Sequence, residues 1–163
     1  MAIDKIQSES INLADNFAFT GTVSGTGANT PAFFAYPTAE QDLANNTTVQ
    51  VVLNAELYDT ANAFASNAFT VPSGQGGKYV LNFGIRRNNW TSDRFYTLLK
   101  KGSASIFEMD SYGKSYSTNN GFTLQQLAAG DVITLFAYQN NGSTQPIHAG
   151  SASTFFCGYK IIE

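Results

Sequence analysis

The sequence predicts an all-β domain, and three observations support this fold class. Phe and Tyr are abundant, at 13 and 8 residues against 2 Met, and Gly, Thr and Asn are frequent, a composition that favours strands and turns over helices. Apolar and polar residues alternate in short segments that turn-forming residues separate. Only 13% of the 163 residues are charged while 43% are apolar, so the chain has enough apolar surface for one folded domain.

The strands are expected in a succession that begins near residue 31. Lys78–Arg86 is the clearest of them, because Tyr79, Leu81, Phe83 and Ile85 fall on one face. The strands expected along this body are 32–36, 48–56, 78–86, 94–100, 105–110, 121–124, 132–139 and 155–162. Strands of this length and spacing indicate a sandwich or a barrel.

Residues 1–30 are interpreted as an N-terminal arm, and residues 31–163 as the body. Within the arm, residues 17–23 alternate as a strand would, and residues 25–31 have the Gly-, Thr- and Pro-containing composition of a hinge. The arm is expected to bind a partner through apolar side chains. The candidate anchor residues are Ile6, Ile11, Leu13, Phe17 and Phe19.

The charge pattern excludes two classes of partner. The 9 basic and 12 acidic residues give a net charge of −3 without a basic cluster, so binding to nucleic acid is not expected. No apolar run approaches the ~20 residues of a membrane-spanning helix, so membrane insertion is not expected. The first residues also lack the positive segment and apolar core of a secretory signal.

Two of the expected strands are apolar on both faces, and this pattern predicts an oligomer. Residues 132–138 and most of 155–162 offer no polar face, whereas a strand at the surface of a single sandwich exposes one face to water. No helix is expected that could cover them, so a neighbouring subunit is the expected cover. The candidate interface residues are Phe136, Tyr138, Phe155, Tyr159 and Ile161, although the pattern does not separate core from interface.

The sequence offers no catalytic constellation, so neither an enzyme activity nor a cofactor is expected. His148 is the single histidine, which excludes a multi-histidine metal site, and no Gly-x-Ser-x-Gly motif accompanies it. Residues 74–78 resemble a phosphate-binding loop but lack its first glycine and the Ser or Thr after the lysine, so a turn is expected there.

Three further residues have both a chemical and a structural interpretation. Glu108 and Asp110 share one face of an expected strand and could hold Ca²⁺ or act as a glycosidase pair. Because no further oxygen ligands follow at a fixed spacing, a solvated strand face is the expected interpretation. Cys157 lies in an apolar strand-like run and is expected to be an inert thiol in the core.

One polar stretch is a candidate contact site. Trp90 is the single tryptophan and lies beside Arg and Asn residues, an arrangement that offers a sugar a stacking face and hydrogen bonds. The alternative is a Trp that packs over the end of the sandwich or in a subunit contact. The candidate contact residues are Arg86, Arg87, Asn89, Trp90 and Arg94.

The order of several motifs from residue 31 onward resembles the C1q/TNF-like jelly roll. Residues 69–72, Phe-Thr-Val-Pro, and 77–83, Gly-Lys-Tyr-Val-Leu-Asn-Phe, resemble that family's Phe-x-x-Pro turn and Gly-x-Tyr-x-x-x-Phe strand. Residues 124–132, Leu-Gln-Gln-Leu-Ala-Ala-Gly-Asp-Val, are similar to its Leu-x-x-Gly-Asp-x-Val element. Residues 156–158, Phe-Cys-Gly, resemble its final Phe-x-Gly strand.

The resemblance implies a jelly-roll sandwich that assembles as a homotrimer about a threefold axis. Animal members usually carry a signal peptide and a collagen-like stalk, whereas a short arm before a C1q-like body looks more like bacteriophage structural proteins, whose trimeric knobs decorate the capsid or tip a fibre. We therefore expect a protein of the virion surface whose arm binds other virion proteins and whose loops are candidates for contact with a host surface glycan. The alternative is a secreted carbohydrate-binding adhesin that uses the loop around Trp90.

Overall fold

The computed structural model describes residues 29–88, 93–113 and 116–161. The arm predicted for residues 1–30 therefore lies almost wholly outside the described residues. All five anchor candidates are outside them too: Ile6, Ile11, Leu13, Phe17 and Phe19. Within the described part of the chain, no helix is long and apolar enough to cross a membrane.

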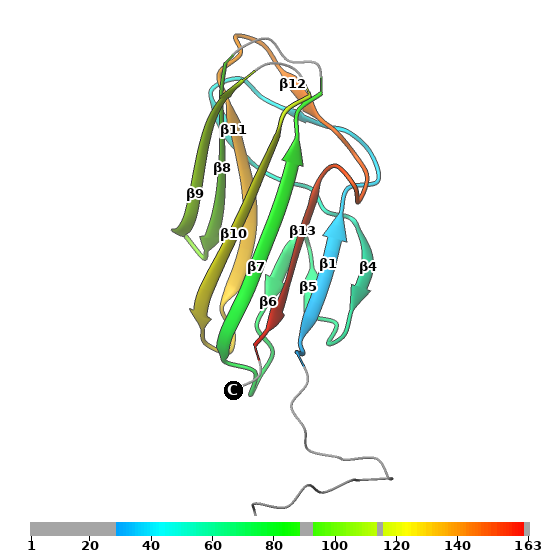
Figure 1. Cartoon of the computed structure of the whole chain (residues 1–163), viewed down its shortest axis with the longest axis vertical. Helices are drawn as coiled ribbons and strands as arrows, with labels where there is room; N and C mark the ends of the chain where they lie inside the picture. Colours follow the sequence, from blue (N-terminus) through cyan, green and yellow to red (C-terminus); the bar gives the residue numbers. More distant parts are fainter. Residues whose placement is uncertain (1–28, 89–92, 114–115, 162–163) are drawn as a thin grey trace, which may run out of the picture.

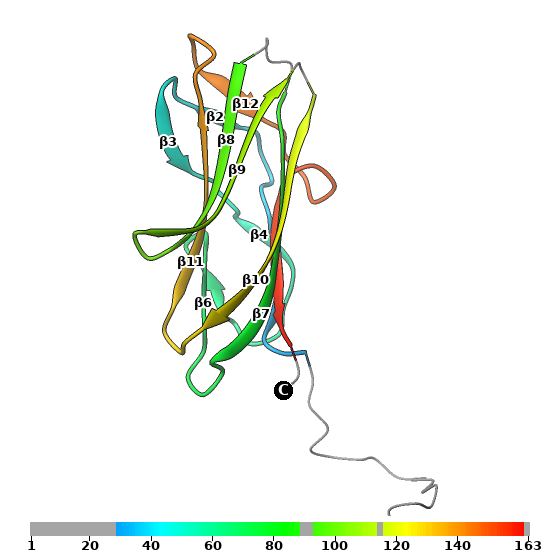
Figure 2. The ribbon, with the colours of Figure 1, turned by 60° about the vertical axis from the view of Figure 1, so that its left-hand side comes forward.

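Two antiparallel sheets pack face to face and form a β-sandwich (Figures 1 and 2). The first, the β7 sheet, has the strand order β10-β7-β13-β1-β4, and the second, the β8 sheet, has the order β5-β6-β11-β8-β9. The β7 sheet contains β1 (Ala32–Tyr36), β4 (Ala55–Asp59), β7 (Gly77–Arg86), β10 (Thr118–Leu127) and β13 (Phe155–Lys160). The β8 sheet contains β5 (Phe64–Ala65), β6 (Ala68–Thr70), β8 (Asp93–Lys101), β9 (Ala104–Gly113) and β11 (Val132–Gln139). Separately, β2 (Gln41–Leu43) pairs with β12 (Gln145–Ile147), and β3 (Thr47–Gln50) lies beside β11.

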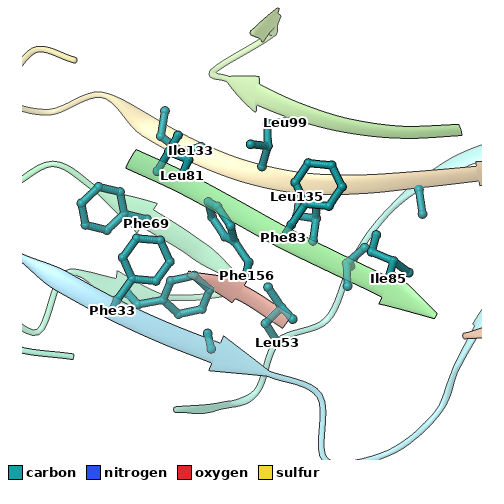
Figure 3. Packing of buried hydrophobic residues seen from close by; sticks show 14 of the residues in the cluster. Phe33, Leu53, Phe69, Leu81, Phe83, Ile85, Leu99, Ile133, Leu135 and Phe156 are labelled. Atoms are coloured by element: carbon teal, nitrogen blue, oxygen red, sulfur yellow. The ribbon is translucent and has the colours of Figure 1, made fainter. Parts of the chain in front are cut away.

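Alternation along the strands places one hydrophobic core between the two sheets (Figure 3). In β7, Tyr79, Leu81, Phe83 and Ile85 are fully buried, which confirms the face predicted from the sequence. The buried side chains that face them from the β8 sheet include Phe95, Leu99, Ile133, Leu135 and Ala137.

Aromatic rings fill the core next to β1. The ring centroid of Phe33 lies 4.5 Å from that of Phe69 and 5.0 Å from that of Phe156, so residues of both sheets meet at this point (Figure 3). Such pairs contribute about 0.5–1.5 kcal/mol each beyond their buried area. The aromatic content that indicated a β fold therefore holds the two sheets together.

Most predicted strands are confirmed, but the single strand predicted over 48–56 is wrong. The structure has β3 and β4 in that region, and residues 51–54 between them cross from beside β11 to the edge of the β7 sheet. Val51 and Leu53 are buried, so the crossing has the apolar alternation of a strand. Side chains from other segments bond its amide groups: the N–H of Val52 donates to Gln41 Oε1 and that of Leu53 to Asn67 Oδ1, both at 2.8 Å.

β1 and β13 are neighbours in the middle of the β7 sheet. β1 begins and β13 ends at the same end of the sandwich, opposite to the end that carries β12 (Figure 1). There the N–H of Lys160 donates to the carbonyl of Pro31 at 3.0 Å. Any contact made through the residues before β1 therefore starts from the end opposite to β12.

Candidate interaction surfaces

The outer face of the β7 sheet, which points away from the core, carries a row of side chains across all five strands. Cross-strand pairing places Tyr58, Phe34, Cys157, Asn82 and Phe122 side by side in this row. Phe122 is 60% exposed and Tyr58 is 49% exposed, so the row is open to solvent in the single chain. An aromatic row of this kind is a candidate subunit interface.

A neighbouring row on the same face consists of Ala32, Tyr159, Val80 and Leu124. Leu124 is 58% exposed and Tyr159 is 40% exposed, although both are large and apolar or aromatic. The second row therefore extends the apolar surface towards the end of the sandwich where β13 ends.

Phe155 lies flat on this face. Its ring stacks on Phe34 with 5.2 Å between the ring centroids. On its other side, a Cβ atom at Gly84 would come within 2.7 Å of Phe155 Cε1, so a side chain there would displace the ring. The glycine gives the ring room to lie against the backbone of β7.

Charge is missing from the centre of the same face. The outward residues of β7 between Lys78 and Arg86 are Val80, Asn82 and Gly84, and the outward residues of β1 and β13 are also uncharged. An extended apolar surface without charge is uncommon on a protein that stays monomeric in water. At the end of this face, a pocket of about 220 Å³ is lined by Lys78, Leu124, Gln125, Gln126 and Ile161.

Cys157 lies on this outer face, so its predicted position in the core is wrong. Phe156 and Gly158, its neighbours in β13, are buried on the inner side, and strand alternation turns the thiol outward. The thiol is half-buried, and burial raises its pKa to about 11. Because the thiolate is the reactive form, such a thiol is a poor nucleophile at neutral pH.

The outer face of the β8 sheet also carries aromatic rings, but basic side chains lie over them. Tyr96 and Tyr138 are cross-strand partners, and the guanidinium carbon of Arg94 lies 4.9 Å from the Tyr96 ring centroid and 5.7 Å from that of Tyr138. Farther along the sheet, the ammonium group of Lys100 lies 4.4 Å from the Phe136 ring centroid. Each contact is a favourable cation–π geometry.

The interface residues predicted from the sequence therefore fall on opposite sides of the sandwich. Phe155 and Tyr159 lie on the outer face of the β7 sheet, and Ile161 lines the pocket at its end. Phe136 and Tyr138 lie on the outer face of the β8 sheet. Because the core separates the two faces, one flat contact surface includes either the first group or the second.

The prediction that Arg87 is a contact residue is wrong, because the side chain is buried. Its side chain is only 1% exposed, and Nη2 donates to Ser111 Oγ at 2.9 Å inside the sandwich. The guanidinium carbon also lies 5.1 Å from the Phe95 ring centroid, and burial lowers the pKa of the group. The hydrophilic character of arginine suggested exposure, but here the side chain joins a polar network between the sheets.

The other contact candidates are not brought together on one surface. Arg86 lies at the outer face of the β7 sheet, 5.6 Å from the Tyr116 ring centroid, whereas Arg94 lies on the outer face of the β8 sheet. Asn89 and Trp90 lie outside the described residues.

The acidic pair lies where the sequence predicted it. Glu108 and Asp110 are both exposed on the outer face of β9. Asp110 Oδ2 accepts from Arg94 Nε at 2.8 Å, and a hydrogen bond from Tyr96 holds the pKa of Glu108 below its usual value. Among the described residues, no group of three or more His, Cys, Asp or Glu side chains could hold a metal ion. His148 follows β12 in a loop, as predicted.

Four residues of the β7 sheet's outer face were not predicted from the sequence: the half-buried Phe34 and the exposed Tyr58, Phe122 and Leu124. The signal for two of them was present, because Phe122 and Leu124 are two residues apart and must share a face of a strand. The strand predicted at 121–124 was too short to reveal that this face belongs to the ten-residue β10.

The sandwich with this strand order is a C1q/TNF-like jelly roll, and solved structures share the fold. No protein-family model matches the chain, and no curated protein sequence does. The globular domain of zebrafish complement 1qA protein matches with a TM-score of 0.60 and 15% identity, covering 82% of this chain and 99% of that one. Vertex protein P5 of PRD1 matches with a TM-score of 0.67 and 16% identity, covering 83% and 100%. Murine APRIL matches with a TM-score of 0.60 and 13% identity, covering 80% and 98%.

Proposed function

We propose that this protein is a homotrimeric, non-catalytic structural component of a virion surface, assembled through the outer face of its β7 sheet. The observation that carries the proposal is the uncharged aromatic surface of that face, where Phe34, Phe155 and Tyr159 lie together. Covering such a surface removes apolar area from water at about 25 cal/mol per Å². A second copy of the same chain supplies a complementary apolar face without another partner.

A threefold arrangement is favoured over a twofold one by the fold. The C1q/TNF resemblance implies trimers whose inner sheets meet along a threefold axis, and in this chain the uncharged outer face belongs to the β7 sheet. Phe155, Tyr159 and Ile161 are then the interface residues retained from the sequence prediction. Phe136 and Tyr138 lie on the sheet that would face outward.

One observation supports the assignment to a virion, and a second supports the proposed orientation of the arm. One is the likeness in fold to vertex protein P5 of PRD1, at 16% identity. The other is the position of β1, which begins at the end of the sandwich opposite to β12 (Figure 1). An anchor in residues 1–30 would then hold one end of the knob to other virion proteins and leave the opposite end free for a host surface.

The solution mass tests the assembly. Three chains of 17.6 kDa give about 53 kDa in light scattering, and we expect this mass over a wide range of protein concentration. A mass that stays at one chain would overturn the proposed trimer.

Deletion of residues 1–28 tests the anchor. We expect the shortened chain to keep the trimer mass, because the described strands begin at residue 32, and to be absent from purified virus particles. The full-length variant with Phe17→Asp and Phe19→Asp is the matched test, and it should behave in the same way. Incorporation that survives both changes would show that the arm is not the anchor.

A further inference from the structure

The outer face of the β8 sheet holds an arginine in a fixed orientation next to an exposed tyrosine. Arg94 is the cross-strand partner of Tyr112, and Tyr96 is the partner of Asp110. Arg94 Nε donates to Asp110 Oδ2 at 2.8 Å while its guanidinium lies over Tyr96. The ring of Tyr138 also lies beside the Arg94 guanidinium, and the Tyr138 hydroxyl donates to Asn46 Oδ1 at 3.1 Å. Two rings and one carboxylate thus fix the guanidinium before any ligand arrives.

The same residues keep hydrogen-bonding capacity that faces solvent. Within the described part of the chain, the bonds of the Arg94 guanidinium involve Nε only, which leaves the N–H groups of its two terminal nitrogens as donors. Asp110 uses Oδ2 in that pair, so its Oδ1 remains an acceptor. The side chains of Arg94 and Asp110 are 37% and 38% exposed, and Tyr112 is 75% exposed. Donor, acceptor and open aromatic ring therefore lie next to one another.

We infer that Arg94, Asp110 and Tyr112 form a binding site for a neutral glycan. Vicinal hydroxyl groups of a pyranose both donate and accept hydrogen bonds, which matches the adjacent guanidinium and carboxylate. The C–H face of the sugar packs on the ring of Tyr112, an aromatic side chain with an apolar body and a polar tip. Asp110 offsets the charge of Arg94, and Glu108 adds a further carboxylate beside Tyr96. The site therefore has no excess positive charge with which to select a phosphate or an acidic peptide.

The cost of binding is low at such a site because its polar groups are already ordered. A hydrogen bond from Tyr96 to Glu108 and the bond from Tyr138 to Asn46 hold the two supporting rings in place. Side-chain ordering otherwise reduces affinity by about 0.5–1.5 kcal/mol per flexible side chain. The site is open and shallow, so each copy binds weakly. Three copies would strengthen binding to a surface, a gain that rests on the proposed trimer whereas the site itself does not.

The test uses the full-length protein and two kinds of probe. An array of neutral and acidic glycans finds the preferred sugar, and methyl glycosides of galactose, glucose and N-acetylglucosamine are then titrated in the tens of millimolar while NMR follows the Arg94 Nε–H signal. We expect neutral glycosides to shift that signal. We expect Tyr112→Ala and Asp110→Asn to weaken binding at least ~10-fold, and Tyr112→Phe to retain most of it.

Tyr116→Ala is the matched control. Tyr116 is also an exposed tyrosine near an arginine, at 52% exposure, but its neighbour Arg86 belongs to the β7 sheet. We expect this variant to bind like the unchanged protein. Binding that Trp90→Ala abolishes and Tyr112→Ala leaves intact would overturn the proposed site, and so would the absence of any shift with all three glycosides. The proposed glycan site would also be overturned if the protein bound other proteins and no glycan. A monomer mass with the shift retained would refute the trimer and leave the site standing.

Discussion

The two outer faces of this sandwich have similar aromatic residues and different surroundings. On the β7 sheet, Phe155 stacks on Phe34 and no charged side chain lies between Lys78 and Arg86 along β7. On the β8 sheet, Phe136 lies under Lys100, and Arg94 covers two tyrosines. Long basic side chains cover apolar surface with their stems and keep their charge in water.

The difference shows that an outward aromatic residue is not by itself a sign of a subunit interface. Phe136 and Phe155 are both half-buried in the single chain. Phe136 reaches that state through a neighbouring lysine, whereas Phe155 reaches it through another ring and a glycine. The first arrangement suits contact with water, and the second leaves apolar area that association would bury.

The largest expected effect is loss of assembly in Phe155→Glu. A carboxylate in an apolar interface loses its hydration without gaining a partner, so the dissociation constant of the trimer should rise by at least ~100-fold. Light scattering should then report a single chain. Leu124→Glu, at a position that is 58% exposed, should act in the same direction without disturbing the fold.

Phe136→Glu is the matched change on the other face, where it gains Lys100 as a partner. It should leave the mass at that of a trimer. Dissociation by Phe136→Glu together with an unchanged mass in Phe155→Glu would reverse the assignment of the two faces.

The reactivity of Cys157 tests how far the outer face of the β7 sheet shields the thiol from water. A pKa of about 11 in place of the ordinary thiol value of 9.0 lowers the thiolate fraction at pH 8 by about 100-fold. Ellman's reagent should therefore react about 100-fold more slowly with the folded protein than with the urea-unfolded chain, and the rate should rise as the pH approaches 11. Because the chain has 1 Cys, the signal is unambiguous. Equal rates in the two states would show an open, ordinary thiol.

Gly84→Ala should weaken the trimer moderately. The new methyl group would come within 2.7 Å of Phe155 Cε1 and of Asn120 Oδ1, so the ring must lift from the sheet. We expect about a 10-fold weaker association and a loss of about 1 kcal/mol in unfolding free energy, measured by sedimentation and by urea denaturation. Gly76→Ala, whose nearest contact would be 3.4 Å, is the control and should change neither quantity.

The smallest expected effect belongs to Lys100→Gln on the β8 face. Removal of the ammonium group from the Phe136 ring should lower the unfolding free energy by about 0.5 kcal/mol, measured by urea denaturation. The trimer mass should not change. A change in mass would mean that the β8 face takes part in assembly.

Much of the fold could be predicted from the sequence because local alternation reports which side of a strand is buried. The four inward residues of β7 are an example, since a period of two is enough to place them together. The crossing at 51–54 could not be predicted in this way. Its apolar alternation is that of a strand, and only the distant partners Gln41 and Asn67 distinguish it from one.

The interaction surfaces could be predicted only in part. The position of Lys100 over Phe136 and of Arg94 over Tyr138 depends on the register between β8 and β11, which no local pattern gives. The burial of Arg87 likewise depends on the tertiary fold and could not be predicted from the local sequence. Its charge indicated exposure, but the sandwich encloses it beside Ser111.

The place of β13 in the β7 sheet also affects how the protein is made. β13 lies between β7 and β1, yet it follows β1 by roughly 120 residues in the chain. During synthesis, β1 and β7 must wait for this last strand before they share a sheet, and contacts of such long range form slowly. The aromatic face therefore forms only after β13 has been made, because Phe155 and Tyr159 lie in that strand.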